Sequence, residues 1–192
     1  MNIFVLDENP FVSATMIDCV TLPKMITESA QMMAQALRNH GATDEQMPLT
    51  KSGTAYKGGY KHHPSTKWVS MNRSNFTWLC HHAMGMLDEQ YSRFGTVHSC
   101  HNPIYHMSAM SDMIPDGELT PFALAMPDEF RPKHSTVTLP CDVDRYKVTH
   151  ASGKDAVQSY RAYYMSKVDS KGGVHYRHTN PPDWWRGVEV TA

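Results

Sequence analysis

One stretch of the chain, between Ser74 and Gly95, keeps a helical spacing of apolar residues for five turns. Residues three or four positions apart lie on one face of an α-helix, so this spacing requires a long helix that buries one side. Ser74 is expected to cap the start of the helix, and Gly95 is expected to end it. The apolar positions are Phe76, Leu79, Cys80, Ala83, Met86, Leu87, Tyr91 and Phe94.

Three other segments have helical patterns. Residues 22–39 are expected to form an amphipathic helix, with Thr21 at its N-cap and Gly41 closing it. Residues 155–168 are expected to form the last long helix. Asn102-Pro103 is expected to start a short helix that runs to about Met110.

The remaining segments carry weaker signals. Residues 3–6 are apolar and short, which fits either a strand or an anchored terminus. Residues 41–72 are expected to form a long loop, and prolines break residues 114–150 into mostly loop. Val137–Leu139 and Tyr146–Val148 have the pattern of a small β-hairpin. The sequence therefore predicts a mainly α protein with three principal helices and long loops.

Composition limits the class of protein. The chain has 192 residues, with 18 basic and 19 acidic side chains, so residues 1–192 suit a single domain and the net charge favours no partner. It has no apolar leader and no apolar run long enough to cross a membrane. Its four cysteines include no Cys-x-x-Cys pair, which favours free thiols in a reducing compartment, the cytoplasm.

Basic side chains gather in residues 46–87, which contain no acidic residue. The basic positions are Lys51, Lys57, Lys61, Lys67 and Arg73. Aromatic residues such as Tyr56, Tyr60 and Trp68 lie between them. Cations bind phosphates and aromatic rings stack on bases, so this segment is a candidate nucleic-acid surface. The alternative is a solvated loop whose aromatic rings fill the core.

Histidines suggest a second kind of site. His98, Cys100 and His101, with His106 beyond them, are residue types that bind zinc. A tetrahedral site needs about four ligands that converge from two elements, and the usual spaced pairs are missing here. Polar loop and helix-surface positions are the simpler interpretation, so we predict no metal and no other cofactor.

One face of the long helix carries Trp78, His82, Gly85 and Glu89, away from the apolar stripe. A stacking ring, an imidazole and a carboxylate on one face are suited to lining a pocket. A half-exposed helix side with a buried Trp explains the same pattern.

The helix at residues 22–39 carries an amine and a carboxylate one turn apart, near its start. Lys24, Glu28, Gln31 and Gln35 recur at helical spacing and line a polar face. An isolated Lys/Glu pair of this kind is ordinarily a surface ion pair of small energetic weight. The same two groups can also be the acid and base of an active site.

Three segments, taken in order, resemble the small phage pyrimidine-dimer DNA glycosylases of the endonuclease V type. Residues 24–31 resemble the helix that carries the catalytic glutamate of those enzymes. Residues 127–131, Pro-Asp-Glu-Phe-Arg, look like their Pro-x-Glu-Phe-Arg segment, and residues 160–164, Tyr-Arg-Ala-Tyr-Tyr, are similar to their Tyr-basic-x-Tyr-Tyr run. Most of the chain also resembles a group of phage proteins that open Met-Asn-Ile-Phe-Val-Leu-Asp and share the motif at residues 120–129.

The resemblance implies a DNA glycosylase with AP-lyase activity. In such enzymes an amine attacks C1′ of the damaged nucleotide, the base leaves, a Schiff base forms, and β-elimination cuts the strand. Glu28 would be the catalytic carboxylate, and Arg131 and Arg161 would contact phosphates. The partner would be double-stranded DNA with a damaged or modified base, in the host cytoplasm if a phage encodes the chain.

The chain departs from the family pattern around the nucleophile. The family uses the α-amine of a small residue, whereas residue 2 here is Asn. The nucleophile would therefore be the Met1 amine, or Lys24 if that amine is desolvated enough to be partly neutral. Residues 19–21, Cys-Val-Thr, also replace the family's Asp-x-His.

The phosphate contacts differ as well, because Thr27 and Gln31 replace the arginines that flank the family glutamate. Other residues would have to hold the DNA, and the target base stays open. Candidate phosphate or base contacts are His63, Lys67, Arg73, Arg131 and Arg161. An extruded base needs a pocket, for which Trp68, Trp78 and His82 are the candidate lining residues.

Two other functions fit the sequence. One is a non-catalytic phage protein that binds nucleic acid or protein on the same scaffold, and Glu28 on a flat exposed surface would favour it. The other is a zinc-dependent hydrolase or deaminase, which requires the histidines and Cys100 to converge. A concave basic cleft with an amine beside Glu28 would favour the glycosylase.

Overall fold

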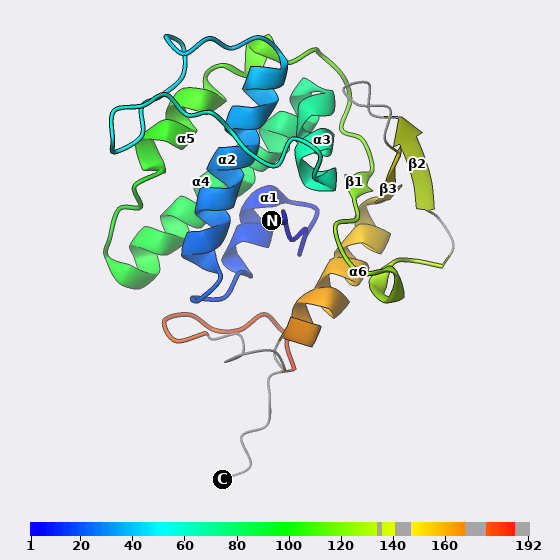
Figure 1. The fold of residues 1–192 in the computed structure, drawn as a ribbon. Coiled ribbons are helices and arrows are strands. Elements are labelled where there is room, and N and C mark those ends of the chain that lie inside the picture. The colour runs from blue at the N-terminus through cyan, green and yellow to red at the C-terminus, as the bar shows by residue number, and fades with distance from the viewer. Residues whose placement is uncertain (134–135, 141–146, 168–175, 187–192) are drawn as a thin grey trace.

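The structure is a computed structural model that describes residues 1–133, 136–140, 147–167 and 176–186. These residues form a mainly helical fold with a small three-stranded sheet at one side (Figure 1). The helices are α1 (Pro10–Thr15), α2 (Leu22–Asn39), α3 (Pro64–Met71), α4 (Arg73–Phe94), α5 (His101–Ser108) and α6 (Gly153–Ser166). The strands are β1 (Phe122–Ala123), β2 (Thr136–Pro140) and β3 (Lys147–Ala151), and two 3-10 turns are η1 (Ser111–Met113) and η2 (Asp128–Phe130).

α2 has the predicted bounds, and α4 overlaps the predicted long helix closely. α6 begins two residues before the predicted residue 155, and the predicted last residue, 168, lies outside the described residues. α5 overlaps the predicted short helix. The prediction of a loop over residues 41–72 is wrong at its end, where Pro64–Met71 form α3. The sequence pattern did not reveal this helix, because its eight residues are buried on most sides and show no apolar stripe. His63 caps α3, since its side chain accepts the Ser65 N–H, and Pro64 occupies the first turn.

The start of α4 is capped by Asn72 and not by Ser74. The Asn72 side chain accepts the N–H of Asn75 at 2.9 Å, whereas the Ser74 hydroxyl donates to the carbonyl of Gly117 at 2.6 Å. Gly95 ends the helix as predicted, with a left-handed φ of 64° that suits glycine.

α4 is buried on two sides, because α1 covers the face that carries Trp78, His82 and Gly85. A Cβ on Gly85 would lie 2.9 Å from the Cβ of Ala14, so only glycine allows the two helices to approach this closely. Trp78 is 5% exposed and His82 is fully buried. α1 has only six residues, too few for a periodic pattern, so the sequence did not reveal what covers this face.

The sheet has the order β1-β3-β2, and both pairings are antiparallel. β2 and β3 form the hairpin that the sequence suggests, with Leu139 opposite Val148. Tyr146, the first residue of the predicted second strand, lies outside the described residues. α6 packs beside the sheet, and its Tyr160 hydroxyl donates to the carbonyl of Ala123 in β1 at 2.7 Å.

The N-terminal segment runs through the middle of the molecule, beside α2, α3 and β1 (Figure 1). Residues 3–6 form no strand, and none of them is more than 4% exposed, so they are an anchored terminus. The Ser13 hydroxyl accepts the Leu6 N–H at 3.0 Å and donates to the Phe4 carbonyl at 3.1 Å. Arg161 donates from Nε to the Leu6 carbonyl at 2.8 Å. Side chains thus supply the hydrogen bonds that a neighbouring strand would otherwise supply.

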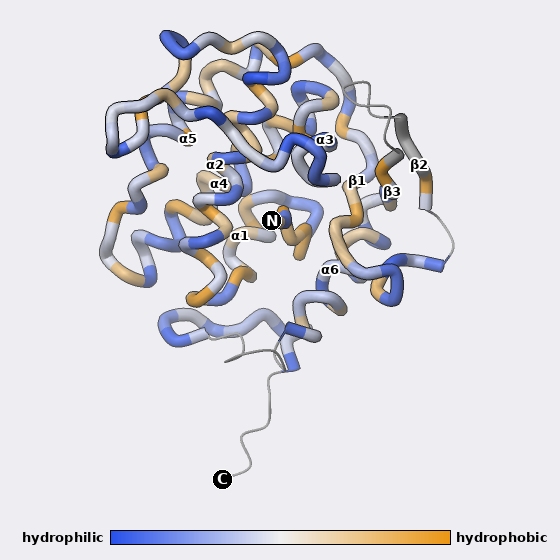
Figure 2. Tube along the Cα trace, in the orientation of Figure 1, coloured by the Kyte–Doolittle hydropathy of each residue, from blue (hydrophilic) through white to orange (hydrophobic). Residues whose placement is uncertain are grey.

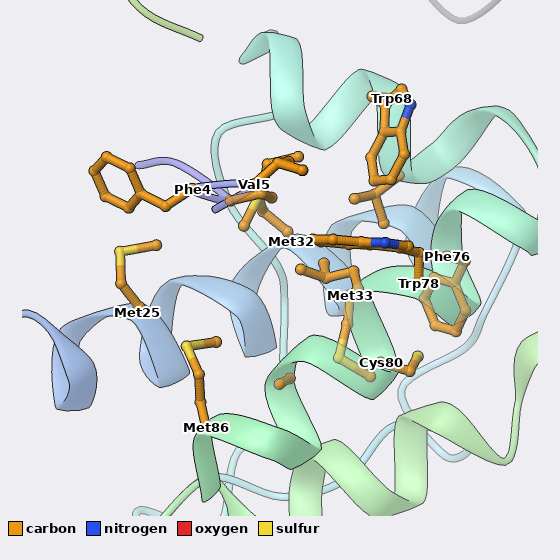
Figure 3. Packing of buried hydrophobic residues seen from close by; sticks show 14 of the residues in the cluster. Phe4, Val5, Met25, Met32, Met33, Trp68, Phe76, Trp78, Cys80 and Met86 are labelled. Atoms are coloured by element: carbon orange, nitrogen blue, oxygen red, sulfur yellow. The ribbon is translucent and has the colours of Figure 1, made fainter. Parts of the chain in front are cut away.

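Methionines and aromatic rings fill the core between α2, α3 and α4 (Figure 3). Figure 3 shows Trp68 standing above the flat ring of Trp78, and the two rings meet edge to face with centroids 6.0 Å apart. Cys19, Cys80 and Cys100 are buried and free, as expected for the cysteines that the structure describes.

The long connection between α2 and α3 is largely hydrophilic (Figure 2). It passes over α2 at Gly58, whose left-handed φ is 81° and where a Cβ would lie 2.6 Å from the Cα of Gln35. Within the described residues, no helix combines the length and apolarity that a membrane crossing needs.

Buried His82 makes the stability of the fold sensitive to acid. Burial lowers the pKa of His82 to about 3, and neither ring nitrogen has a hydrogen-bond partner among the described residues. An unfolded chain has a histidine pKa of about 6.5, so below that pH the unfolded state binds a proton that the folded state excludes. The free energy of unfolding therefore falls as the pH drops, and His82 accounts for about 2 kcal/mol between pH 7.5 and 5.

We expect His82→Leu to make this fall about 2 kcal/mol smaller, because leucine carries no titrating group. Urea denaturation at pH 7.5 and pH 5.0 measures the difference. His81→Leu, at the exposed neighbouring position, is the matched control and should keep the wild-type pH dependence. If the free energy of unfolding of His82→Leu fell as much as that of wild type between the two pH values, His82 would not be the source of the acid sensitivity.

Candidate active site

A cavity of about 300 Å³ opens where the N-terminal segment meets the start of α2 and the end of α6. It is lined by Met1, Asn2, Phe4, Val20, Thr21, Lys24, Met25, Glu28, Tyr163 and Lys167. Three of these residues carry amines, counting the α-amine of Met1, and Glu28 is the one acidic residue among them. The lining is therefore net positive around a single carboxylate.

Glu28 is the centre of this cavity. Its Oε2 lies 3.6 Å from the α-amine of Met1 and accepts the backbone N–H of Asn2 at 3.0 Å. Its Oε1 lies 3.7 Å from Nζ of Lys24. The Glu28 side chain is 13% exposed, whereas that of Lys24 is 72% exposed. The carboxylate thus meets two amines, the α-amine of Met1 and the largely exposed amine of Lys24.

The start of α2 fixes where Glu28 points. Asp18 accepts the backbone N–H groups of Val20 and Thr21 at 2.8 and 3.0 Å, and it also takes a hydrogen bond from the Tyr164 hydroxyl. Thr21 occupies the N-cap position, as predicted, but its side chain makes no capping bond. Asp18, which is fully buried, is therefore the anchor that joins the entry of α2 to α6.

Asn2 holds the chain beside Glu28. Its side-chain oxygen accepts the N–H groups of Ile3 and Phe4 at 2.8 and 3.0 Å, and its amide donates to the Ala125 carbonyl at 2.7 Å. The residue is 5% exposed. A large polar side chain at position 2 is explained by these bonds, which satisfy the backbone where it enters the core.

Residues at the start of α3 contact Met1. The Thr66 hydroxyl donates to the Met1 sulfur at 3.5 Å. Burial lowers the pKa of His63, the nearby Met1 amine lowers it further, and Glu28 and a hydrogen bond to the Met1 backbone partly oppose the shift. Burial and the nearby amine thus favour the neutral form of His63, whose Nδ1 accepts the Ser65 N–H.

Lys167 is the cavity residue that sequence reasoning missed. It follows the last turn of α6, and its Nζ lies 4.8 Å from the ring centroid of Tyr163 and 5.6 Å from that of Phe4. The rings of Phe4 and Tyr163 stack at 6.0 Å. Lys167 lies one turn after Tyr163, so extending the helical spacing of residues 160–164 would have identified it.

The other predicted phosphate contacts lie away from this cavity lining and are engaged within the protein. Arg131 binds Asp128 at 2.8 Å and the Met126 carbonyl at 3.1 Å. Arg161 binds the Leu6 carbonyl and lies 3.7 Å from Asp7. Arg73 lies 3.3 Å from Asp112, and Lys67 is 3% exposed in α3.

Of the residues predicted to line a base pocket, Trp68 and His82 are fully buried, whereas Trp78 is 5% exposed and lines a different cavity together with Arg73. Trp68 is fully buried, and its indole N–H donates to the Pro121 carbonyl at 3.0 Å. Trp78 donates to the Glu8 carbonyl at 2.9 Å and stacks on His82 with centroids 5.1 Å apart. The cavity around Glu28 contains none of the three.

The histidine and cysteine ligand cluster does not assemble. His98 accepts the Cys100 N–H, His101 contacts Asn102, and His106 contacts the Gln46 carbonyl at 2.8 Å. Within the part of the chain that the structure describes, no group of three or more His, Cys, Asp or Glu side chains is placed to hold a metal ion.

Comparison with protein-family models, with curated proteins and with solved structures finds no match. The functional interpretation therefore depends on the chemistry of the cavity around Glu28 and on the sequence resemblance of the helix that bears this residue.

Asn2→Ala should destabilise the fold, because it leaves two buried N–H groups without an acceptor. An unpaired buried donor costs roughly 1–3 kcal/mol, so we expect the free energy of unfolding to fall by about 3 kcal/mol in urea denaturation. Asn102→Ala, at an exposed position, is the control and should change it by less than about 0.5 kcal/mol. Equal losses in the two variants would show that Asn2 is not an anchor.

Proposed function

We propose that the protein is a DNA glycosylase with AP-lyase activity, which acts on the N-glycosidic bond of a damaged or modified nucleotide. The Met1 α-amine is the nucleophile and Glu28 is the catalytic carboxylate. The observation that carries the proposal is the 3.6 Å separation of these two groups at a cavity lined by two further amines. The resemblance to the endonuclease V type of enzyme supports the same roles.

The reaction uses an amine and a carboxylate in turn. The amine lone pair forms a bond to C1′ while the C1′–N bond breaks, and the base leaves with the electron pair and takes a proton. Ring opening at C1′ then gives a Schiff base. Loss of a C2′ proton breaks the C3′–O bond, the 3′ phosphate leaves, and water releases the amine.

Glu28 suits both proton transfer and charge stabilisation. A carboxylate 3.6 Å from the amine can take its proton before attack, and its charge stabilises the cation that develops at C1′. Its limited exposure strengthens that interaction, because less water screens it.

Met1 is a better nucleophile candidate than Lys24. α-Amines are as a class less basic than lysine side chains, so a larger share carries a free lone pair near neutral pH. The amine of Lys24 lies on a side chain that is 72% exposed, where burial cannot make it more reactive.

The alternative is a non-catalytic phage protein that binds nucleic acid or protein on this scaffold. One observation favours it: Glu28 also accepts the Asn2 N–H, so the contacts around Met1 can serve only to anchor the terminus. Both functions would place the protein with its partner in the cytoplasm, that of the host if a phage encodes it.

Glu28→Gln should abolish most of the chemistry while keeping the anchor, because the amide oxygen can still accept the Asn2 N–H. Duplexes with an abasic site, with irradiated pyrimidine dimers or with phage-modified bases are incubated with the protein and sodium borohydride. We expect wild type to form a trapped covalent adduct on at least one of them, and Glu28→Gln to form it about 100-fold more slowly. Glu45→Gln, at an exposed position, is the matched control.

Peptide mapping of the trapped adduct should place it on Met1, and adding one glycine before Met1 should abolish trapping because it displaces the amine. An adduct on Lys24 would assign the nucleophile there instead. No adduct and no released base on any of these substrates would refute the glycosylase and favour the binding protein.

A further inference from the structure

We infer that Thr66 is a positioning residue for the proposed reaction, because its hydroxyl holds the Met1 side chain and thereby orients the Met1 α-amine. This inference rests on the proposed function, in which that amine is the nucleophile. Thr66 lies in α3 and does not line the cavity around Glu28, so it touches neither the substrate nor the reacting atoms. Its effect on the reaction is transmitted through Met1.

The accessible part of Met1 is its backbone end. The Met1 side chain is 1% exposed, although the residue as a whole is half-buried, so solvent reaches the backbone atoms, which include the amine. The same residue lines the cavity around Glu28. Met1 therefore keeps its side chain inside the protein and presents its backbone end at the cavity.

The Thr66 hydroxyl makes the hydrogen bond that fixes this side chain. Its Oγ1 donates to the Met1 sulfur at 3.5 Å, and Thr66 is fully buried. A thioether sulfur is a weak acceptor, but leaving a buried hydroxyl unpaired is costly. The bond therefore favours the conformation of Met1 in which the sulfur faces α3.

The geometry of the backbone explains how this bond controls the amine. The peptide bond between Met1 and Asn2 is planar, and the Glu28 carboxylate fixes its N–H at 3.0 Å. The backbone rotation that still moves the amine is the one about the Cα–C bond of Met1. The amine and the side chain share that Cα, so the same rotation also pulls the sulfur away from Thr66. Holding the sulfur therefore restrains the amine at its position 3.6 Å from Glu28.

A restrained amine reacts faster than a mobile one. Rotation of a terminal residue that is not held carries its amine away from the carboxylate that takes its proton. Misplacing a reacting group by about 1 Å can slow a reaction by roughly 100-fold. A single hydrogen bond to sulfur restrains the amine less completely, so its loss should slow the reaction about tenfold.

Thr66→Val removes the hydroxyl and keeps the shape of the side chain. In borohydride trapping on a saturating duplex with an abasic site, we expect Thr66→Val to form the adduct about tenfold more slowly than wild type. Its affinity for a duplex with a tetrahydrofuran abasic analogue should stay within about twofold in fluorescence anisotropy, because Thr66 does not line the cavity. Thr66→Ser keeps a hydroxyl and should retain most of the rate. Thr27→Val, which removes an exposed hydroxyl from the helix that bears Glu28, is the matched control and should react like wild type.

A double-mutant cycle separates positioning through Met1 from a general effect on the fold. Met1→Leu, produced by cleavage of a leader peptide, keeps most of the bulk of the side chain and loses the sulfur. Met1→Leu should also form the adduct about tenfold more slowly, and adding Thr66→Val should slow it no further. Losses that multiply to about 100-fold would show that the two residues act independently, and the inference would be wrong. An unchanged rate in Thr66→Val would overturn it as well.

The inference and the proposed function can fail separately, because the anchor can be observed without substrate. Methionine labelled with carbon-13 in its methyl group gives an NMR signal for Met1, which is identified by its loss in Met1→Leu. Thr66→Val should move this signal toward the position of free methionine. If the signal moves but wild type traps no adduct, the anchor stands and the amine chemistry falls. If wild type traps the adduct and Thr66→Val changes neither the signal nor the rate, the chemistry stands and the positioning role falls.

Discussion

Side chains from several helices hydrogen-bond to the backbone of the first six residues, and without them this apolar segment could not lie in the core. The Asn2 side chain accepts the N–H of the next residue. Other hydrogen bonds come from Ser13 in α1, Glu28 in α2 and Arg161 in α6. An extended segment without a neighbouring strand would otherwise bury unpaired N–H and carbonyl groups. The N-terminal segment therefore joins three helices, and two of them, α2 and α6, contribute residues to the cavity.

The same bonds that stabilise the fold also fix the candidate chemistry. The Glu28 oxygen that accepts the Asn2 N–H is the one nearest to the Met1 amine. In the proposed mechanism, the oxygen that anchors the Asn2 N–H is therefore also the one that acts on the Met1 amine, and a variant without a side-chain acceptor at position 28 would disturb both roles. Glutamine separates them, because it keeps an acceptor and loses the ability to take a proton. The φ of 38° at Phe4 is tolerated for a related reason: the ring it directs packs under Lys167 and against α6.

Periodicity in the sequence was sufficient to predict α2, α4 and α6, because each presents an apolar face over several turns, and the Asn102-Pro103 start signal predicted α5. It could not predict α1, which is too short for a period, or α3, which is buried on most sides and shows no apolar stripe. The helix that covers Trp78 and His82 therefore stayed unknown, and a pocket lining and a half-exposed side with a buried Trp both remained open. The polar face of α2 was predictable, and with it Glu28 and Lys24. Lys167 and the neighbourhood of Met1 were not, since they depend on long-range contacts that no local pattern encodes.

Asn2 departs from the small residue that the resembled glycosylases carry at this position, and the departure has a physical explanation. A reactive amine on residue 2 would have to leave the core, whereas Asn2 is buried and its N–H is bound to Glu28. The peptide bond to Met1 carries the amine one residue further, to the edge of the cavity and still 3.6 Å from the carboxylate. In the proposed function, Asn2 therefore both excludes the nucleophile of the resembled family and positions the Met1 amine that would replace it.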